Sequence, residues 1–185
     1  MSLGRNNTYV LKQPRKVYIV VGTAEQELGY TFGGIRFTIS DETYMIETDQ
    51  IGPLDEIIKK YELTIVTPFL QWHPELLAKL VPGSNLVEDG TEAGTYKLEI
   101  GTCTGLSLRT YAVPLILRPE SKSAGEYEDD IKLWLASPTG SREVSFGQEG
   151  SKEVTEVTWK SFPVTTAGYT TTNNLCVIGD PAITA

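Results

Sequence analysis

Histidine and cysteine, which most often bind transition metals or act as base and nucleophile in enzymes, are scarce in this sequence. The 185 residues include one histidine, His73, and two cysteines, Cys103 and Cys176. The cysteines do not have a CxxC or other zinc-ligand spacing, and a disulfide scaffold would carry more of them. These counts favour two reduced thiols and predict no metal site.

Long hydrophobic runs are also missing. The longest, such as Val17 to Val21 and Ala112 to Leu117, fall far short of the ~20 residues that a membrane helix needs. Residues 1–16 contain no apolar core of signal-peptide length. We therefore expect a soluble protein that stays inside the cell that makes it and has no membrane partner.

Basic residues are outnumbered by acidic ones. Lysine and arginine number 16 and aspartate and glutamate 24, which gives a net charge of −8. An acidic chain gains little from counterion release on nucleic acid. The balance argues against a nucleic-acid-binding protein, although local basic patches stay possible.

The sequence is rich in segments in which apolar and polar residues alternate. Turns with glycine, proline or aspartate separate about eight of them, which predicts an all-β domain, an antiparallel sandwich or barrel. These segments include residues 17–21, 35–39, 44–49, 57–65, 96–100, 111–117, 131–135 and 157–159. We expect this single domain to span residues 1–164.

One segment has helical spacing instead. Leu76, Leu77 and Leu80 recur on one face between Pro74 and Gly83. Proline suits the first turn of a helix and glycine the position just past its end. The pattern predicts one short helix over residues 73–81 that packs its leucines on the sheet and has His73 as a polar cap.

Two stretches have the composition of irregular structure. Residues 47–56 contain Gly52-Pro53 and are too long for a tight hairpin turn. Residues 165–185 are rich in threonine, glycine and asparagine, with an apolar island at Leu175 to Ile178. We expect a long loop in the first case and a C-terminal arm outside the core in the second.

No enzyme motif stands out. Gly101-Thr-Cys-Thr-Gly105 has the glycines of a nucleophile elbow, but a strand pattern follows where that motif needs a helix. The carboxylates are numerous, and nothing singles out a catalytic pair among them. There is no phosphate-binding glycine loop. We expect no catalytic residues and no cofactor.

The tryptophans leave an alternative open. Trp72, Trp134 and Trp159 are candidates for a sugar-stacking platform, whereas the apolar pattern around Trp72 and Trp159 favours core packing. A ligand- or carbohydrate-binding β-sandwich, with Trp134 and tyrosines in an exposed aromatic row, is the alternative function. A hydrolase that works through carboxylates is a third.

The order of motifs resembles that of bacteriophage tail tube proteins, the major tail proteins. The resembling features are Leu28-Gly-x-Thr-x-Gly-Gly34 before a strand, Glu47-x-Asp-Gln50, Pro53-Leu-Asp-Glu56, a strand at Tyr61 to Leu70 and the helix with Glu75-Leu-Leu-Ala-Lys-Leu80. The later Val113-Pro-Leu-x-Leu117 and the final strand at Val154 to Phe162 fit the same order, so the resemblance covers most of the chain.

The resemblance implies a structural virion protein and not an enzyme. Such proteins stack as hexameric rings into a hollow tail tube that conducts DNA during ejection, and they assemble in the cytoplasm of the host bacterium. The implied partners are further copies of the chain and other tail proteins: the sheath if the tail contracts, the tape measure, the baseplate and the terminator. DNA passes through the lumen without specific binding.

The resemblance also implies two sets of site residues. One is a loop that reaches the neighbouring ring, formed by Asp49, Gln50, Ile51, Gly52, Pro53, Leu54, Asp55 and Glu56. The other follows from strand alternation: if the apolar faces of strands 34–49 and 57–67 fill the core, their other faces look outward, and in tube proteins that face lines the lumen. The lumen candidates are Arg36, Thr38, Glu47, Asp49, Lys60, Glu62 and Thr64.

Overall fold

The structure is a computed structural model that describes residues 6–10, 14–31, 33–48, 52–70, 73–122, 125–144, 155–166, 168–170 and 172–181. Eleven strands and one helix occur in these ranges, which confirms the predicted all-β fold with a single short helix. The elements are β1 (Asn6–Val10), β2 (Arg15–Val21), β3 (Ala24–Glu27), β4 (Arg36–Thr48), β5 (Gly52–Phe69), α1 (Pro74–Leu80), β6 (Asn85–Glu88), β7 (Tyr96–Glu99), β8 (Val113–Pro119), β9 (Ile131–Val144), β10 (Thr155–Ser161) and β11 (Cys176–Ile178).

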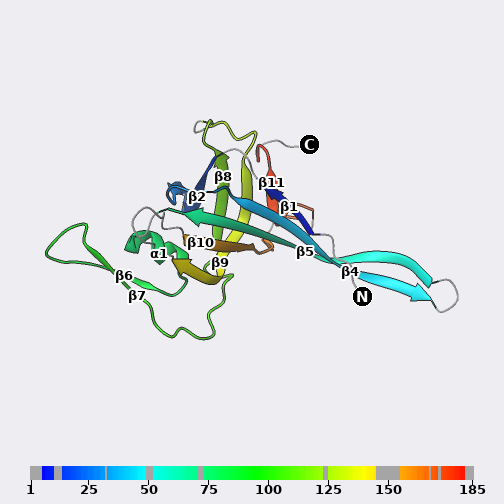
Figure 1. The fold of residues 1–185 in the computed structure, drawn as a ribbon, viewed down its shortest axis with the longest axis horizontal. Coiled ribbons are helices and arrows are strands. Elements are labelled where there is room, and N and C mark those ends of the chain that lie inside the picture. The colour runs from blue at the N-terminus through cyan, green and yellow to red at the C-terminus, as the bar shows by residue number, and fades with distance from the viewer. Residues whose placement is uncertain are drawn as a thin grey trace.

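One antiparallel sheet of nine strands forms the body, and β6 and β7 make a separate two-stranded sheet beside α1 (Figure 1). The strand order of the large sheet is β1-β4-β5-β10-β9-β8-β2-β3, and β11 also pairs with β9. The segment after β3 returns to β5, where Thr31 bridges Phe69 and the Leu70 amide donates to the Tyr30 carbonyl at 3.0 Å. The sheet thus curls round on itself into a barrel-like body.

The core lies inside this curled sheet. On β10 the residues Val157 and Trp159 are fully buried, while Glu156, which precedes Val157 and points to the other face, is exposed. The Trp159 indole N–H donates to the Thr67 hydroxyl at 2.9 Å, which satisfies its one polar atom. The prediction that Trp159 belongs to the core is confirmed, and Trp72 lies outside the described residues.

Helix α1 matches its prediction closely. The His73 Nδ1 accepts a hydrogen bond from the Leu76 amide at 3.1 Å, so His73 is the predicted cap. Leu76 and Leu80 are buried in the hydrophobic core, whereas Leu77 is half-buried. The helix therefore closes one side of the core through two of its three leucines.

We expect Leu80→Ala to lower the free energy of unfolding by roughly 2–5 kcal/mol, because it leaves a cavity in the core. Chemical denaturation gives this value directly. Leu77→Ala is the matched control and should cost less, since Leu77 is only half-buried. A loss below about 0.5 kcal/mol for Leu80→Ala would show that the helix does not pack on the core.

Strand β5 is the longest element, with 18 residues, and its partner β4 has 13. Their outer parts, residues 41–48 of β4 and 52–63 of β5, pair with each other and project beyond the barrel (Figure 1). We call this two-stranded ribbon, whose outer end is drawn in cyan, the arm. The arm corrects the predicted long loop: Gly52 to Glu56 belong to β5, and Asp49, Gln50 and Ile51 lie outside the described residues. Two bulges in β5, at Lys59 and Leu54, have no opposite residue in β4. The last three residues of β5, Thr67 to Phe69, extend past the pairing with β4 and pair with β10.

The C-terminal segment also differs from the prediction. The apolar island pairs with β9 in the register Cys176–Leu133 and Ile178–Ile131, and Leu175 and Cys176 pack against the core. The expectation that the whole stretch lies outside the core is therefore wrong for this island. β10 pairs with the later part of β9, from Ala136 onward. β11 pairs with the earlier part of the same edge, from Ile131 to Leu133.

Candidate assembly surface

The arm presents strand edges without a described neighbour. β1 pairs with β4 only over Arg36–Ser40, and β10 pairs with β5 only over Thr64–Phe69. In the part of the chain that the structure describes, no strand lies along the outer edge of β4 beyond Ser40 or of β5 before Thr64. Such edges are templates for pairing with another chain.

Large apolar side chains lie exposed along the arm. Their exposed fractions range from 46% to 56%, and they are Tyr44, Leu54, Ile57, Ile58 and Tyr61. Residues opposite each other in a sheet share a face, so Tyr44 and Ile57 lie on one face of the arm and Ile58, opposite Thr43, lies on the other.

An isolated two-stranded ribbon is only marginally stable in water. An apolar surface of this kind typically marks an interaction site. Both edges of the arm are thus without a neighbour among the described strands, and apolar side chains are exposed on both of its faces. These are the features of a segment that another chain covers.

A charged face adjoins the base of the arm. Along β4 and β5 the alternate residues Phe37, Leu63 and Ile65 are buried, so the residues between them look outward. The structure thereby places five lumen candidates on one outward face: Arg36, Thr38, Lys60, Glu62 and Thr64. Whether this face lines a channel stays a prediction.

Glu47 does not share that face. β4 runs without a bulge from Arg36 to Thr48, because both irregularities fall in β5. Residues an odd number of positions apart in such a strand point to opposite faces. Glu47 is therefore opposite in direction to Arg36 and Thr38, and grouping it with them was wrong. Asp49 lies outside the described residues.

The outward face continues onto β10, which sequence reasoning did not connect with β4 and β5. Lys160 lies opposite Thr64, and its ammonium is 2.8 Å from the Glu62 carboxylate. This hydrogen bond is the main reason why the pKa of Glu62 is lowered, although partial burial opposes it. The alternation of Glu156, Thr158 and Lys160 was the available sequence signal, but it did not show which strand lies next to β10.

A buried ion-pair network on the other side of the barrel is structural. The Arg118 guanidinium is 2.9 Å from Asp130 and 2.9 Å from Glu25, and its centre lies 5.3 Å from the Tyr18 ring and 5.1 Å from the Tyr127 ring. Burial alone lowers the pKa of Arg118, but hydrogen bonds to the two carboxylates outweigh it and raise the pKa above its usual value. The network ties β8 to β3 and to the segment before β9.

The candidates for catalysis do not come together. Cys103 is exposed in the irregular segment before β8, where its thiol lies 3.6 Å from the Gly83 carbonyl, and His73 caps α1. Among the described residues, no group of three or more histidine, cysteine, aspartate or glutamate side chains is placed to hold a metal ion. These observations supply no catalytic arrangement on which to build a mechanism.

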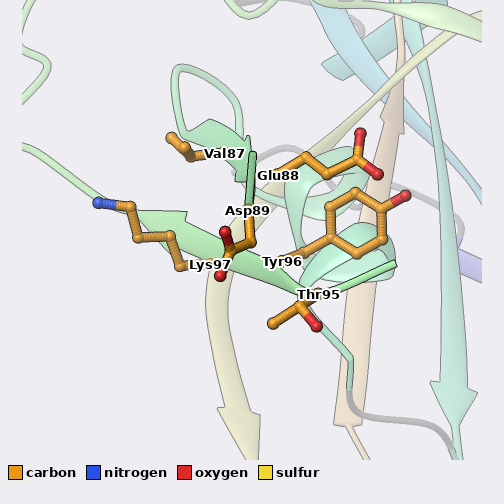
Figure 2. Close-up of a pocket in the computed structure, with 6 residues that line it drawn as sticks. All are labelled: Val87, Glu88, Asp89, Thr95, Tyr96 and Lys97. Atoms are coloured by element: carbon orange, nitrogen blue, oxygen red, sulfur yellow. The ribbon is translucent and has the colours of Figure 1, made fainter. Parts of the chain in front are cut away.

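A hollow of about 320 Å³ on the β6–β7 hairpin is equally unpromising as a binding site. Figure 2 shows that its side chains diverge: Lys97 extends away from Tyr96, which lies near Glu88. The Asp89 carboxylate accepts hydrogen bonds from the amide and hydroxyl of Thr91 and so stabilises the turn. No polar groups converge on a ligand here.

The aromatic platform of the alternative function is partly occupied by the protein itself. The Trp134 indole N–H donates to the Asn173 carbonyl at 2.8 Å, and the Tyr169 ring meets Trp134 edge-on. The Lys132 ammonium lies over the Trp134 ring, 4.9 Å from its centre. The Lys132 ammonium thus covers one face of the ring on which a sugar would stack.

Comparison of the sequence with protein-family models and with curated proteins gives no match. In the described residues, none of the helical structure is long and apolar enough to cross a membrane. The arm and the charged face beside it are the features of the molecule that bear on its function.

Proposed function

We propose that this protein is a structural subunit of a bacteriophage tail tube, which stacks as hexameric rings into a hollow tube that conducts DNA. The observation that carries the proposal is the projecting arm, whose two strand edges have no neighbour among the described strands and whose apolar side chains are exposed. This combination favours assembly over a function as a single soluble copy.

The geometry of the arm suits a ring. β4 and β5 are antiparallel, so in a cyclic arrangement the β5 edge of one copy meets the β4 edge of the next in antiparallel orientation. Each copy then uses two different edges, and such a head-to-tail contact closes into a ring when the rotation fits. The arms of all copies would form one continuous β-barrel around a channel.

The other parts of the molecule take roles in the same assembly. The outer end of the arm, with Leu54, Asp55 and Glu56, extends away from the barrel and reaches the neighbouring ring. The charged face at the base of the arm, around Thr38 and Glu62, lines the channel. Sheath, tape measure, baseplate and terminator proteins are the proposed further partners, and the virion tail is the proposed location.

Sedimentation velocity over a range of protein concentrations tests this function. The proposal predicts fast-sedimenting polymers that grow with concentration or on addition of tail-completion factors. A monomer at every concentration, with and without those factors, would contradict it. A monomer that instead binds oligosaccharides, with quenching of Trp134 fluorescence, would support the carbohydrate-binding alternative.

A further inference from the structure

At the base of the arm, the outward face of β4, β5 and β10 carries charges and hydroxyls, whereas its continuation toward the outer end carries Tyr44 and Ile57. Five rows cross these strands at the base of the arm, and their side chains are hydroxyls or charges apart from Val66 and Pro68. The residues of this face are Arg36, Thr38, Ser40, Glu42, Lys60, Glu62, Thr64, Val66, Pro68, Glu156, Thr158 and Lys160. We call this set the charged face.

Positive and negative charges on the charged face cancel. It has three bases and three acids, and every base lies close to an acid. Arg36 is 3.4 Å from Glu156, Lys60 is 3.1 Å from Glu42, and Lys160 is 2.8 Å from Glu62. Lys60 is also 3.9 Å from Glu62. Within the described part of the chain, Glu62 is thus the one carboxylate of this face that lies within 4 Å of two lysine ammonium groups.

Duplex DNA binds where lysine and arginine neutralise phosphates and release their counterions. On the charged face, each phosphate that approached a lysine would also approach the carboxylate already beside it. The attraction and the repulsion nearly cancel at this range, so little binding energy is left. The bases remain hydrated and solubilising, but they do not form a phosphate-binding patch.

We infer that Glu62 withholds Lys160, and together with Glu42 withholds Lys60, from the phosphates of duplex DNA that meets the charged face. The inference depends on the proposed function, which supplies DNA as the molecule that passes this face. Cancellation of charge matters more in a tube than in one subunit, because weak contacts of DNA with many subunits along the wall would together retain the DNA strongly.

The test measures binding of a short DNA duplex to unassembled subunits by fluorescence anisotropy, in salt on the order of 10 mM, where the Debye length is about 30 Å. The variant Glu62→Gln/Glu156→Gln removes two of the three carboxylates of the charged face. Glu42 remains, beside Lys60, while Lys160 and Arg36 lose their partners. The matched control, Glu47→Gln/Glu92→Gln, makes the same change of net charge at exposed positions for which the described structure has no lysine or arginine partner.

We expect the natural protein and the control to leave the duplex unbound. The variant should bind it, with log K falling against log salt at a slope of about −2 to −3, as for two or three contacted phosphates. Adding Lys60→Gln and Lys160→Gln to the variant should abolish the gain. Circular dichroism of each variant shows that its fold is unchanged.

Three results would overturn the inference: binding by the natural protein, an equal gain in the control, or no gain in the variant. None of them depends on polymerisation, because unassembled subunits are used. Sedimentation of the natural protein tests tube formation separately, so failure of this inference is distinguishable from failure of the proposed function.

Discussion

A subunit with a shortened arm folds as a stable monomer and no longer assembles. The change replaces residues 44–57 with an Asn-Gly turn that joins Thr43 to Ile58, which lie opposite each other in the two strands. A two-residue Asn-Gly turn is the standard connection for such a pair. The deleted segment contains no residue of the buried core, so thermal unfolding should change little while polymers disappear.

A companion variant separates strand pairing from apolar contact. Ile58→Ser/Tyr61→Ser keeps both edges of the arm but removes two exposed apolar side chains from the face opposite the charged face. These side chains are already about half buried in the subunit, so covering each one gains roughly half of the 1.5–3 kcal/mol for full burial. The critical concentration for assembly should therefore rise by about tenfold to a hundredfold. Polymers of normal length from the shortened subunit would refute the role of the arm.

Replacement of Arg118 should have the largest effect on stability. Its side chain and that of Asp130 are 4% and 3% exposed, so Arg118→Met leaves a buried carboxylate without its main partner. Removing one member of a buried ion pair typically costs about 3–5 kcal/mol, and we expect that loss in chemical denaturation.

Two controls make this result specific. Arg36→Met breaks an ion pair with Glu156 in which both side chains are more than half exposed, and it should cost less than about 1 kcal/mol. Arg118→Met/Asp130→Asn should recover part of the loss, because it also removes the buried charge. A cost for Arg118→Met no larger than that for Arg36→Met would show that the network contributes little.

The local features of this fold were predictable from sequence. Alternation over short segments predicted the strands, and the leucine spacing between Pro74 and Gly83 predicted the helix, because both patterns depend only on near neighbours. The cap at His73 and the buried Trp159 followed from the same local patterns.

Features that depend on strand pairing were not predictable in this way. Gly52-Pro53 is typical of a turn, yet it lies at the start of β5, where proline is tolerated and bulges absorb the extra residues. The contact of Glu62 with Lys160 joins positions about a hundred residues apart and depends on β10 lying next to β5. Arg118 and Glu25 are similarly distant in sequence.

Electron microscopy of the concentrated protein tests most directly whether this subunit builds a tube. The proposed function predicts long hollow filaments made of stacked six-membered rings, with the arms of neighbouring copies joined edge to edge in the inner wall. A field of separate particles, or filaments in which the arms of β4 and β5 point away from the channel, would contradict it.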